Sequence, residues 1–402
     1  MGKKFRFKKK ALPKKTEADI HAKGQYFTTN STLQEKIFEF ILNDPSTILE
    51  PSFGQGDLVK YVSDKNNSVV FDMYEIDESI KLLDGIGDNN LEYCDFLSKN
   101  INKKYKTIIG NPPYVKTRTG NLYIDFIRKC VNLLQENGEL IFIIPSDFFK
   151  LTSAKNVLID MMKDGTFTHI FHPHNENLFK GAAIDIIIFR YCKNKSLDKK
   201  LLYNNVEKFI INSDGLVTFS NIQQTNMTKM EDIFNIYVGL VSAKESVYKN
   251  DKFGNIMVLN GKETFTKYIY INKFPTKNKE LNEYLKSYKS ILMSRKIRKF
   301  NANNWFEWGA PRNIKIMENN KDKPCIYMHT MTRSNKVAFK SKVNYFGGGI
   351  LMLKPKININ LDKIVVYLNS IEFRKNFIYS GRFKIGHRQI SKSYIDNSWK
   401  LG

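Results

Sequence analysis

Cysteine is scarce in this 402-residue sequence, and long apolar runs are missing from it. The four cysteines are scattered without the spacing of a metal site or a redox pair, which favours reduced thiols. No apolar run is long enough for a transmembrane helix, and no apolar stretch resembling a secretory signal stands at the start. We therefore expect a cytoplasmic protein of bacterial or viral type, with enough chain for two domains.

Acidic residues are scarce at both ends of the sequence. Residues 251–402 carry 30 Lys and Arg against 10 Asp and Glu, a net charge of +20, and residues 1–15 carry eight basic residues and no acidic one. Residues 16–250 have a net charge of −4, so a lysine-rich composition throughout does not explain the basic ends. Phosphate is the natural partner of such segments, and we expect nucleic acid binding, with residues 1–21 as a flexible basic arm.

Short apolar segments alternate with helical patterns in the first half of the sequence, which predicts an open α/β sheet. The expected strands cover residues 47–49, 69–74, 107–109, 139–144, 169–172 and 184–191, and the expected helices cover 123–135 and 154–163. The alternation is lost after about residue 238, where Lys, Asn and aromatic residues dominate. We expect one domain over 22–195, a connector over 196–239 and a second, mixed domain over 240–402.

Two glycines and two acidic residues follow successive predicted strands. The segment from Glu50 to Gly56 comes directly after the first strand, where glycine permits a tight turn and close approach of a ligand to the backbone. Glu75 ends the second strand, where a carboxylate can accept hydrogen bonds from ribose hydroxyls, although a solvated strand end is the alternative. Asp95, further on, suits either a hydrogen bond to an adenine amino group or a helix cap. Together these features indicate a nucleoside-like cofactor.

A stiff loop rich in hydrogen-bond acceptors follows the strand expected over 107–109. Its sequence is Asn111-Pro112-Pro113-Tyr114, in which two prolines fix φ and remove two backbone donors. The Asn111 side-chain oxygen and the Pro112 carbonyl can hold both hydrogens of a planar amino or amide group, and Tyr114 offers a ring face for stacking. An ordinary Asn-Pro turn is the alternative, but the position after an apolar strand favours a reaction at such a nitrogen.

With these motifs in this order, residues 22–191 resemble the catalytic domain of the gamma-class N6-adenine DNA methyltransferases, the Taq-type family with an Asn-Pro-Pro-Tyr motif. Two departures from the family pattern are Thr29, where a proline is usual, and Lys106-Thr107, where the family usually has an Asp. The resemblance implies a Rossmann-like class I fold that binds S-adenosyl-L-methionine and needs no metal. The catalytic residues that it implies are Asn111, Pro112, Pro113, Tyr114 and Phe179, with Phe179 holding a flipped base against Tyr114.

The same resemblance implies a set of cofactor-binding residues, which begins with the N-terminal motif Gln25-Tyr26-Phe27-Thr28. The full set is Gln25, Tyr26, Phe27, Thr28, Glu50, Pro51, Gly54, Gly56, Glu75, Ile76, Asp95, Phe96 and Asn111. His172 and His174 flank a proline and could suggest a metal site, but no acidic or thiol partner lies near them in the sequence.

The basic second domain is the candidate for target recognition, because a base must leave the duplex to reach such a pocket. Arg and Gln can read base edges, although phosphate contact or plain surface charge is the more common role for each of these residues. The candidate DNA-binding residues are Arg295, Arg298, Arg382, His387, Arg388 and Gln389.

The resemblance thus implies a site-specific methyltransferase acting on adenine N6 in double-stranded DNA, in restriction–modification or genome marking, with a cognate restriction endonuclease encoded separately. The tetrapeptide also occurs in RNA and protein-glutamine methyltransferases, so it indicates the chemistry and leaves the substrate open. Methylation of cytosine N4 and a catalytically inactive DNA-binding protein are further alternatives.

Overall fold

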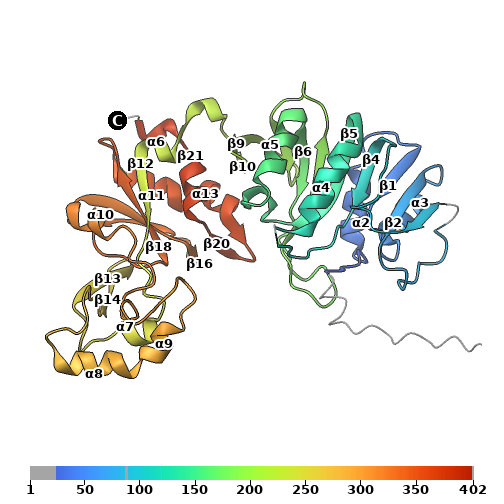
Figure 1. Cartoon of the computed structure of the whole chain (residues 1–402). Coiled ribbons are helices and arrows are strands. Elements are labelled where there is room, and N and C mark those ends of the chain that lie inside the picture. The colour runs from blue at the N-terminus through green and yellow to red at the C-terminus, as the bar shows by residue number, and fades with distance from the viewer. Residues whose placement is uncertain (1–23, 87–88, 119, 401–402) are drawn as a thin grey trace, which may run out of the picture. The chain divides into compact units, whose positions relative to one another are not determined.

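The structure, a computed structural model, describes residues 24–86, 89–118 and 120–400. The chain divides into two compact units, Met1–Ile210 and Ile211–Gly402 (Figure 1). The basic arm predicted over residues 1–21 lies outside the described residues. Residues 196–239, expected as a connector, contain strands and fall partly in each unit. In the described part of the chain, no helix has the length and apolar character needed to cross a bilayer.

The N-terminal unit contains a sheet whose central strands are parallel. Its strands are β1 (Thr47–Glu50), β2 (Val70–Glu75), β3 (Asn90–Tyr93), β4 (Tyr105–Gly110), β5 (Leu134–Pro145), β6 (Thr166–Phe171), β7 (Ile186–Cys192), β8 (Lys200–Tyr203) and, across the unit boundary, β9 (Val206–Ser213). They lie in the order β9-β8-β6-β7-β5-β4-β1-β2-β3. The run from β5 to β3 is parallel, and β7 is antiparallel to both of its neighbours.

Helices cover both faces of this sheet. They are α2 (Ser31–Glu39), α3 (Asp57–Lys65), α4 (Leu122–Leu133) and α5 (Lys155–Asp164), with a short 3-10 turn, η1 (Phe148–Lys150). Ile37 of α2 and Val59 of α3 are buried in one core with Ile141 of β5. Side chains alternate along a strand, so Phe142 faces the other way and its ring packs on Phe189, 6.4 Å between centroids.

The structure confirms six predicted strands, as β1, β2, β4, β5, β6 and β7, and both predicted helices, as α4 and α5. Several predicted boundaries are wrong; the strand expected from residue 184, for example, begins only at Ile186. Gln135, expected in the helix, belongs to β5, because Leu134 already pairs with Tyr105 of β4. His172, expected in a strand, follows the end of β6. The short strand β3 was missed because its four residues are exposed or half-buried and form no apolar run.

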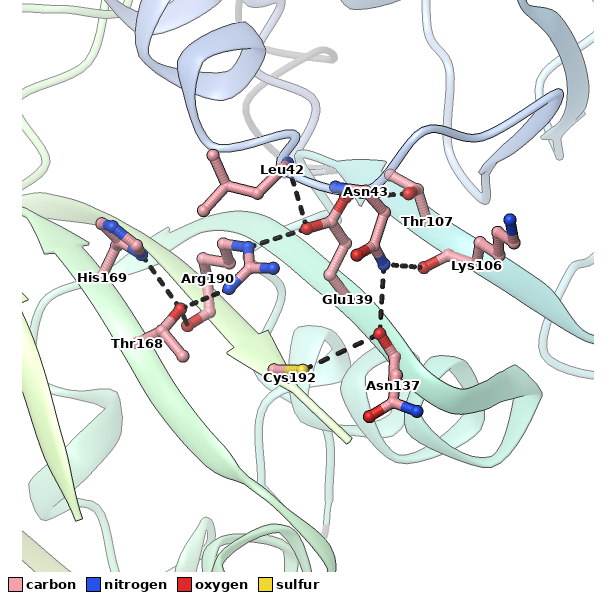
Figure 2. Close-up of polar contacts among 10 residues, drawn as sticks. All are labelled: Leu42, Asn43, Lys106, Thr107, Asn137, Glu139, Thr168, His169, Arg190 and Cys192. Carbon is pink, nitrogen blue, oxygen red and sulfur yellow. Dashed lines mark hydrogen bonds and ion pairs between the residues drawn. The ribbon is translucent and has the colours of Figure 1, made fainter. Parts of the chain in front are cut away.

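A buried polar network joins the end of α2 to the sheet (Figure 2). Glu139 of β5 is fully buried, and its carboxylate accepts hydrogen bonds from the backbone N–H groups of Leu42 (3.2 Å) and Asn43 (3.1 Å). It also accepts from Thr107 Oγ1 (2.9 Å) and Arg190 Nε (2.7 Å). A buried carboxylate needs such partners, so Glu139 fixes the segment after α2 against β4, β5 and β7.

The C-terminal unit is a mixed α/β assembly of short elements. Its strands are β10 (Leu216–Ser220), β11 (Met227–Lys229), β12 (Phe234–Val238), β13 (Ile256–Gly261), β14 (Thr264–Tyr268), β15 (Pro324–His329), β16 (Met331–Thr332), β17 (Ala338–Lys342), β18 (Ile350–Pro355), β19 (Ile378–Tyr379), β20 (Arg382–Lys384) and β21 (Tyr394–Asp396). Its helices are α6 (Met230–Ile233), α7 (Glu245–Tyr248), α8 (Lys279–Ser287), α9 (Lys289–Met293), α10 (Ile314–Asn319), α11 (Leu361–Asn369), α12 (Ile371–Arg374) and α13 (His387–Lys392), with 3-10 turns η2 (Gln224–Asn226), η3 (Lys375–Phe377) and η4 (Asn397–Lys400).

An antiparallel sheet in the order β12-β18-β15-β17 separates two cores in this unit. Tyr327 of β15 is buried in a core that contains Trp305 and Trp308. The next residue, Met328, is buried on the opposite face with Ile364 of α11. Strand alternation therefore covers both faces of the sheet with apolar side chains.

Candidate active site

A cavity of about 570 Å³ opens at the carboxyl ends of β1, β2, β3 and β4. These strands are adjacent and parallel, so the residues that follow each one reach the same edge of the sheet. The volume falls in the range of about 300–1,000 Å³ that is usual for small-molecule and cofactor sites. The predicted site residues that line the cavity are Gln25, Tyr26, Phe27, Pro51, Gly54, Glu75, Ile76, Asp95, Phe96, Asn111 and Pro113.

The loop after β1 depends on Gly56. This residue precedes α3 with φ at +88°, and a Cβ there would lie 2.2 Å from the Ile86 side chain, so only glycine fits. Glu50 is buried at the end of β1 and accepts a hydrogen bond from the backbone N–H of Ser52 at 3.3 Å. Burial raises the pKa of the Glu50 carboxyl well above its usual range. Gly56 and Glu50 therefore support the cavity loop from outside the lining.

Glu75 ends β2 with its carboxylate at the cavity wall. Its Oε2 accepts from the backbone N–H of Gly54 at 3.1 Å, and its Oε1 accepts from the N–H groups of Ile76 and Asp77, each at 3.0 Å. Burial raises the pKa of this carboxyl, although the three donors act in the opposite direction. A carboxylate offers about four acceptor positions, so Glu75 joins two loops and still has capacity for one further donor.

Lys129 of α4 anchors the loop that contains Asp95 and Phe96. Its Nζ donates to the backbone carbonyls of Phe96 and Lys99 and, at 3.3 Å, to that of Leu97. The same ammonium lies 4.6 Å from the centroid of the Phe96 ring. Sequence reasoning missed Lys129, because nothing in the helical pattern distinguishes it from a lysine on a solvated face.

Asn111 is held in one orientation beside the cavity. Its Nδ2 donates to the Tyr26 carbonyl at 2.7 Å and to Thr28 Oγ1 at 3.1 Å, so the N-terminal motif uses both amide hydrogens. The Asn111 Oδ1 accepts from the Tyr114 hydroxyl at 2.6 Å and has a second lone pair for an incoming donor. Burial raises the pKa of the Tyr114 hydroxyl well above its usual range, which keeps that group protonated.

Three aromatic rings gather beside Asn111. The ring of Tyr26 lies 5.5 Å from that of Tyr114 and 5.6 Å from that of Phe179. Tyr114 and Phe179, predicted to hold a base between them, lie 6.2 Å apart at an interplanar angle of 68°. These two rings therefore meet edge to face, and a base stacked between them requires the edge-on ring to turn.

A tight turn brings Phe179 to this place. The N–H of Ala182 donates to the Phe179 carbonyl at 3.4 Å, and Gly181 has φ at +76°, the left-handed conformation that the third residue of such a turn requires. A bond from the Ile184 N–H to the Glu176 carbonyl at 2.9 Å closes the base of the turn. Phe179 is only 3% exposed, in the same core as α2 and α3.

Two of the candidate DNA-binding arginines hold the fold of the C-terminal unit. The guanidinium of Arg295 donates to three backbone carbonyls, those of Leu292 (2.6 Å), Ser242 (3.0 Å) and Trp305 (2.6 Å). Arg298 donates to the carboxylate of Glu307 at 2.7 Å and to the backbone carbonyl of Trp308 at 2.8 Å. All three guanidinium nitrogens of Arg295 are used in these contacts, whereas Arg298 is exposed and bonds through Nη2 alone.

The candidates near the C-terminus differ in whether their side chains are bonded to other parts of the protein. His387 Nε2 lies 3.0 Å from the Ile236 carbonyl, Arg388 Nη2 donates to the Asp214 carbonyl at 2.7 Å, and Gln389 Oε1 accepts from the backbone N–H of Gly386 at 2.6 Å. Arg382 is instead exposed on β20, next to the buried Phe383. Arg382 is therefore the best placed of the predicted residues for an external contact. Within the described residues, no cluster of three His, Cys, Asp or Glu side chains could hold a metal ion.

Residues 55–179 match the family described as Eco57I restriction-modification methylase. Over this segment the chain is similar to the methylase domains of that family. The segment includes the loop after β1, the acceptor loop at Asn111 and the turn at Phe179, so the features described above are part of the matched segment. The predicted resemblance to the N6-adenine DNA methyltransferases is confirmed.

Individual relatives agree with this assignment. The chain is 25% identical to the Type II methyltransferase M.AccI of Acinetobacter calcoaceticus over 51% of this chain, and 27% identical to M.HincII of Haemophilus influenzae over 48%. The aligned parts span about two fifths of those relatives, 40% and 42% of their lengths. Among solved structures, the Type IIL restriction-modification enzyme MmeI in complex with DNA has a TM-score of 0.58 at 9% identity, over 90% of this chain and 63% of that one. The predicted Rossmann-like class I methyltransferase fold is confirmed.

Proposed function

We propose that this chain is a site-specific DNA methyltransferase that transfers the methyl group of S-adenosyl-L-methionine to N6 of an adenine flipped out of duplex DNA. The orientation of Asn111 carries the proposal. Both of its amide hydrogens are bound by Tyr26 and Thr28, so its oxygen is the atom available to accept a hydrogen bond from an amino group. The position of this oxygen beside the cavity fits transfer between a bound cofactor and an exocyclic –NH₂.

The residues that line the cavity have the chemistry that this cofactor requires. Ile76, Phe96 and Pro113 provide apolar surface for a purine, and the Glu75 carboxylate has an acceptor position for ribose hydroxyls. Asp95 lies on the loop that Lys129 holds and can accept from the adenine amino group of the cofactor. When bound, the cofactor supplies an electrophilic methyl group on a positively charged sulfur.

The chain's own groups orient the acceptor nitrogen. Asn111 Oδ1 and the Pro112 carbonyl would hold the two amino hydrogens of the target base, with the nitrogen lone pair directed at the cavity. The N–C bond forms as the S–C bond breaks, and the nitrogen loses one proton afterwards, so no strong general base is needed. Correct placement of the two reactants supplies most of the rate enhancement.

The C-terminal unit is proposed as the target-recognition domain. The net charge of +20 over residues 251–402 favours a polyanion as partner, and the methylase family match favours DNA in a restriction–modification setting. A restriction endonuclease of the same specificity, encoded separately, is the proposed biological partner.

Methyl transfer from radiolabelled cofactor tests the proposal. We expect label in duplex DNA, and digestion to nucleosides should place it in N6-methyl-2′-deoxyadenosine; label confined to RNA, to protein or to cytosine N4 would contradict the proposal. Asn111→Ala should lower transfer about 100- to 1,000-fold, by analogy with loss of one preorganised polar group, and leave DNA binding intact. Asn132→Ala, on the exposed side of α4, is the matched control and should retain full activity.

A further inference from the structure

A chain of hydrogen bonds lies at the foot of the loop that carries Phe179. The Tyr203 hydroxyl is 2.7 Å from His172 Nδ1, and His172 Nε2 is 2.8 Å from Asp185 Oδ1. The Ser146 hydroxyl donates to the other oxygen of Asp185 at 2.6 Å. These four residues come from the ends of β5 and β8 and from the two ends of the loop itself.

One proton arrangement satisfies every group in this chain. Tyr203 donates to Nδ1 of a neutral His172, Nε2–H of His172 donates to Asp185, and Ser146 donates to the second carboxylate oxygen. The side chains of His172 and Asp185 are only 6% and 10% exposed, so the bond between them is shielded from water. Both ring nitrogens of His172 are therefore used within this chain of hydrogen bonds.

Backbone contacts fix the two ends of the loop to the sheet. Asn204, directly after β8, accepts from the His172 N–H at 2.7 Å and donates to the His172 carbonyl at 2.9 Å. At the other end, the Ser146 N–H donates to the Asp185 carbonyl at 2.9 Å. The bond from His172 to Asp185 therefore joins two anchored points, and residues 173–184 form a loop with a closed neck.

We propose that His172 and Asp185 are positioning residues that hold the Phe179 loop closed, so that the Phe179 ring stays packed beside Tyr114 and Tyr26 where a base is received. The role in catalysis depends on the function proposed above. The residues do not touch the cofactor cavity, and they act through the placement of Phe179. Without the closed neck, the tip turn at Gly181 would carry Phe179 away from Asn111 as a unit.

Trypsin cleavage after Lys180 reports the state of the loop directly, because this lysine is exposed at the tip next to the buried Phe179. Cleavage requires local opening, so His172→Ala should be cut after Lys180 about tenfold faster than the wild type. Gln places an N–H donor at the position of Nε2, so His172→Gln should restore most of the protection. His169→Gln is the matched control, since His169 lies on β6, which ends just before His172, and packs on Phe40 away from the neck.

Steady-state methylation of plasmid DNA provides the second measurement. His172→Ala and Asp185→Asn should lower kcat about 10- to 100-fold, because small displacements of a positioning group are costly. The KM for S-adenosyl-L-methionine should stay within about twofold, since the cavity lining is unchanged. A merely structural role predicts instead that kcat falls and the KM for S-adenosyl-L-methionine rises together.

Several outcomes overturn the proposal. Unchanged cleavage after Lys180 in His172→Ala shows that the neck does not hold the loop, whatever the chain methylates. Faster cleavage with wild-type kcat shows that loop closure does not position the base. Faster cleavage in the variant combined with no methyl transfer by the wild-type chain overturns the proposed function and leaves the closed neck standing.

Discussion

In the N-terminal unit the buried carboxylates Glu50 and Glu75 and the half-buried Lys129 hold backbone segments at the site in place, whereas the C-terminal unit uses cations both inside and outside its fold. Lys129 in the first unit and Arg295 in the second each bind three backbone carbonyls. Arg382, which is indistinguishable from Arg295 by charge, is exposed. The difference teaches that a net charge of +20 overstates the number of cations available to phosphate.

The largest loss of stability is expected when the buried carboxylate of Glu139 is removed. Replacing it with alanine leaves Arg190 without its buried carboxylate partner and frees the backbone N–H groups of Leu42 and Asn43 (Figure 2). We expect a loss of about 3–5 kcal/mol in the free energy of unfolding, measured by urea denaturation.

Glu92 supplies the control, because its ion pair with Lys99 is half exposed. Glu92→Ala should cost no more than about 1 kcal/mol. Equal losses in the two variants would show that burial does not distinguish these carboxylates.

The next effect concerns Arg295, the internal cation of the C-terminal unit. Arg295→Ala removes the donor for three carbonyls and should destabilise the protein by about 2–3 kcal/mol in the same denaturation assay. Arg312, which is exposed, is the matched control, and Arg312→Ala should leave stability within about 0.5 kcal/mol of the wild type. A stable Arg295→Ala variant with weakened DNA binding would reverse our assignment of this arginine to the fold.

A smaller effect is expected at Lys129, which belongs to the cofactor side of the N-terminal unit. Lys129→Met retains the length of the side chain and removes its three hydrogen bonds to the loop at Asp95 and Phe96. Because that loop lines the cavity, the dissociation constant for S-adenosyl-L-methionine should rise about tenfold, equivalent to about 1.4 kcal/mol, in isothermal titration calorimetry.

Arg128 lies on the exposed side of the same helix and pairs with Asp125. Arg128→Met should leave cofactor affinity unchanged. A normal dissociation constant in Lys129→Met would mean that the loop keeps its shape without the lysine.

Local sequence predicted the N-terminal site well because its determinants are local. The acceptor loop at Asn111 directly follows β4, and the glycine at position 56 meets a positive φ that other residues avoid. Lys129 and His172 were beyond such reasoning, since their partners are carbonyls or carboxylates more than ten residues away. The roles of those residues arise only when the chain folds.

For the C-terminal unit, the sequence predicted mainly the excess of basic residues and not the arrangement of the elements. The sheet with the order β12-β18-β15-β17 is buried on both faces, so its strands show no simple alternation of apolar and polar residues. The internal role of Arg295 depends on Ser242 and Trp305, 53 and 10 residues away in the sequence. No pattern of spacing encodes such contacts, and charge alone grouped Arg295 with Arg382.

The smallest effect is expected at Arg382, and it tests the contrast between this exposed arginine and the internal Arg295. Arg382→Ala should leave the melting temperature unchanged and, if the side chain meets a phosphate, should reduce the salt dependence of DNA binding by about one counterion. Fluorescence anisotropy of labelled duplex at several salt concentrations measures this slope. Arg382→Lys retains the charge and should restore the slope; failure of lysine to restore binding to the cognate sequence would indicate contact with a base edge, which a guanidinium makes bidentately. An unchanged slope in Arg382→Ala would remove Arg382 from the DNA interface.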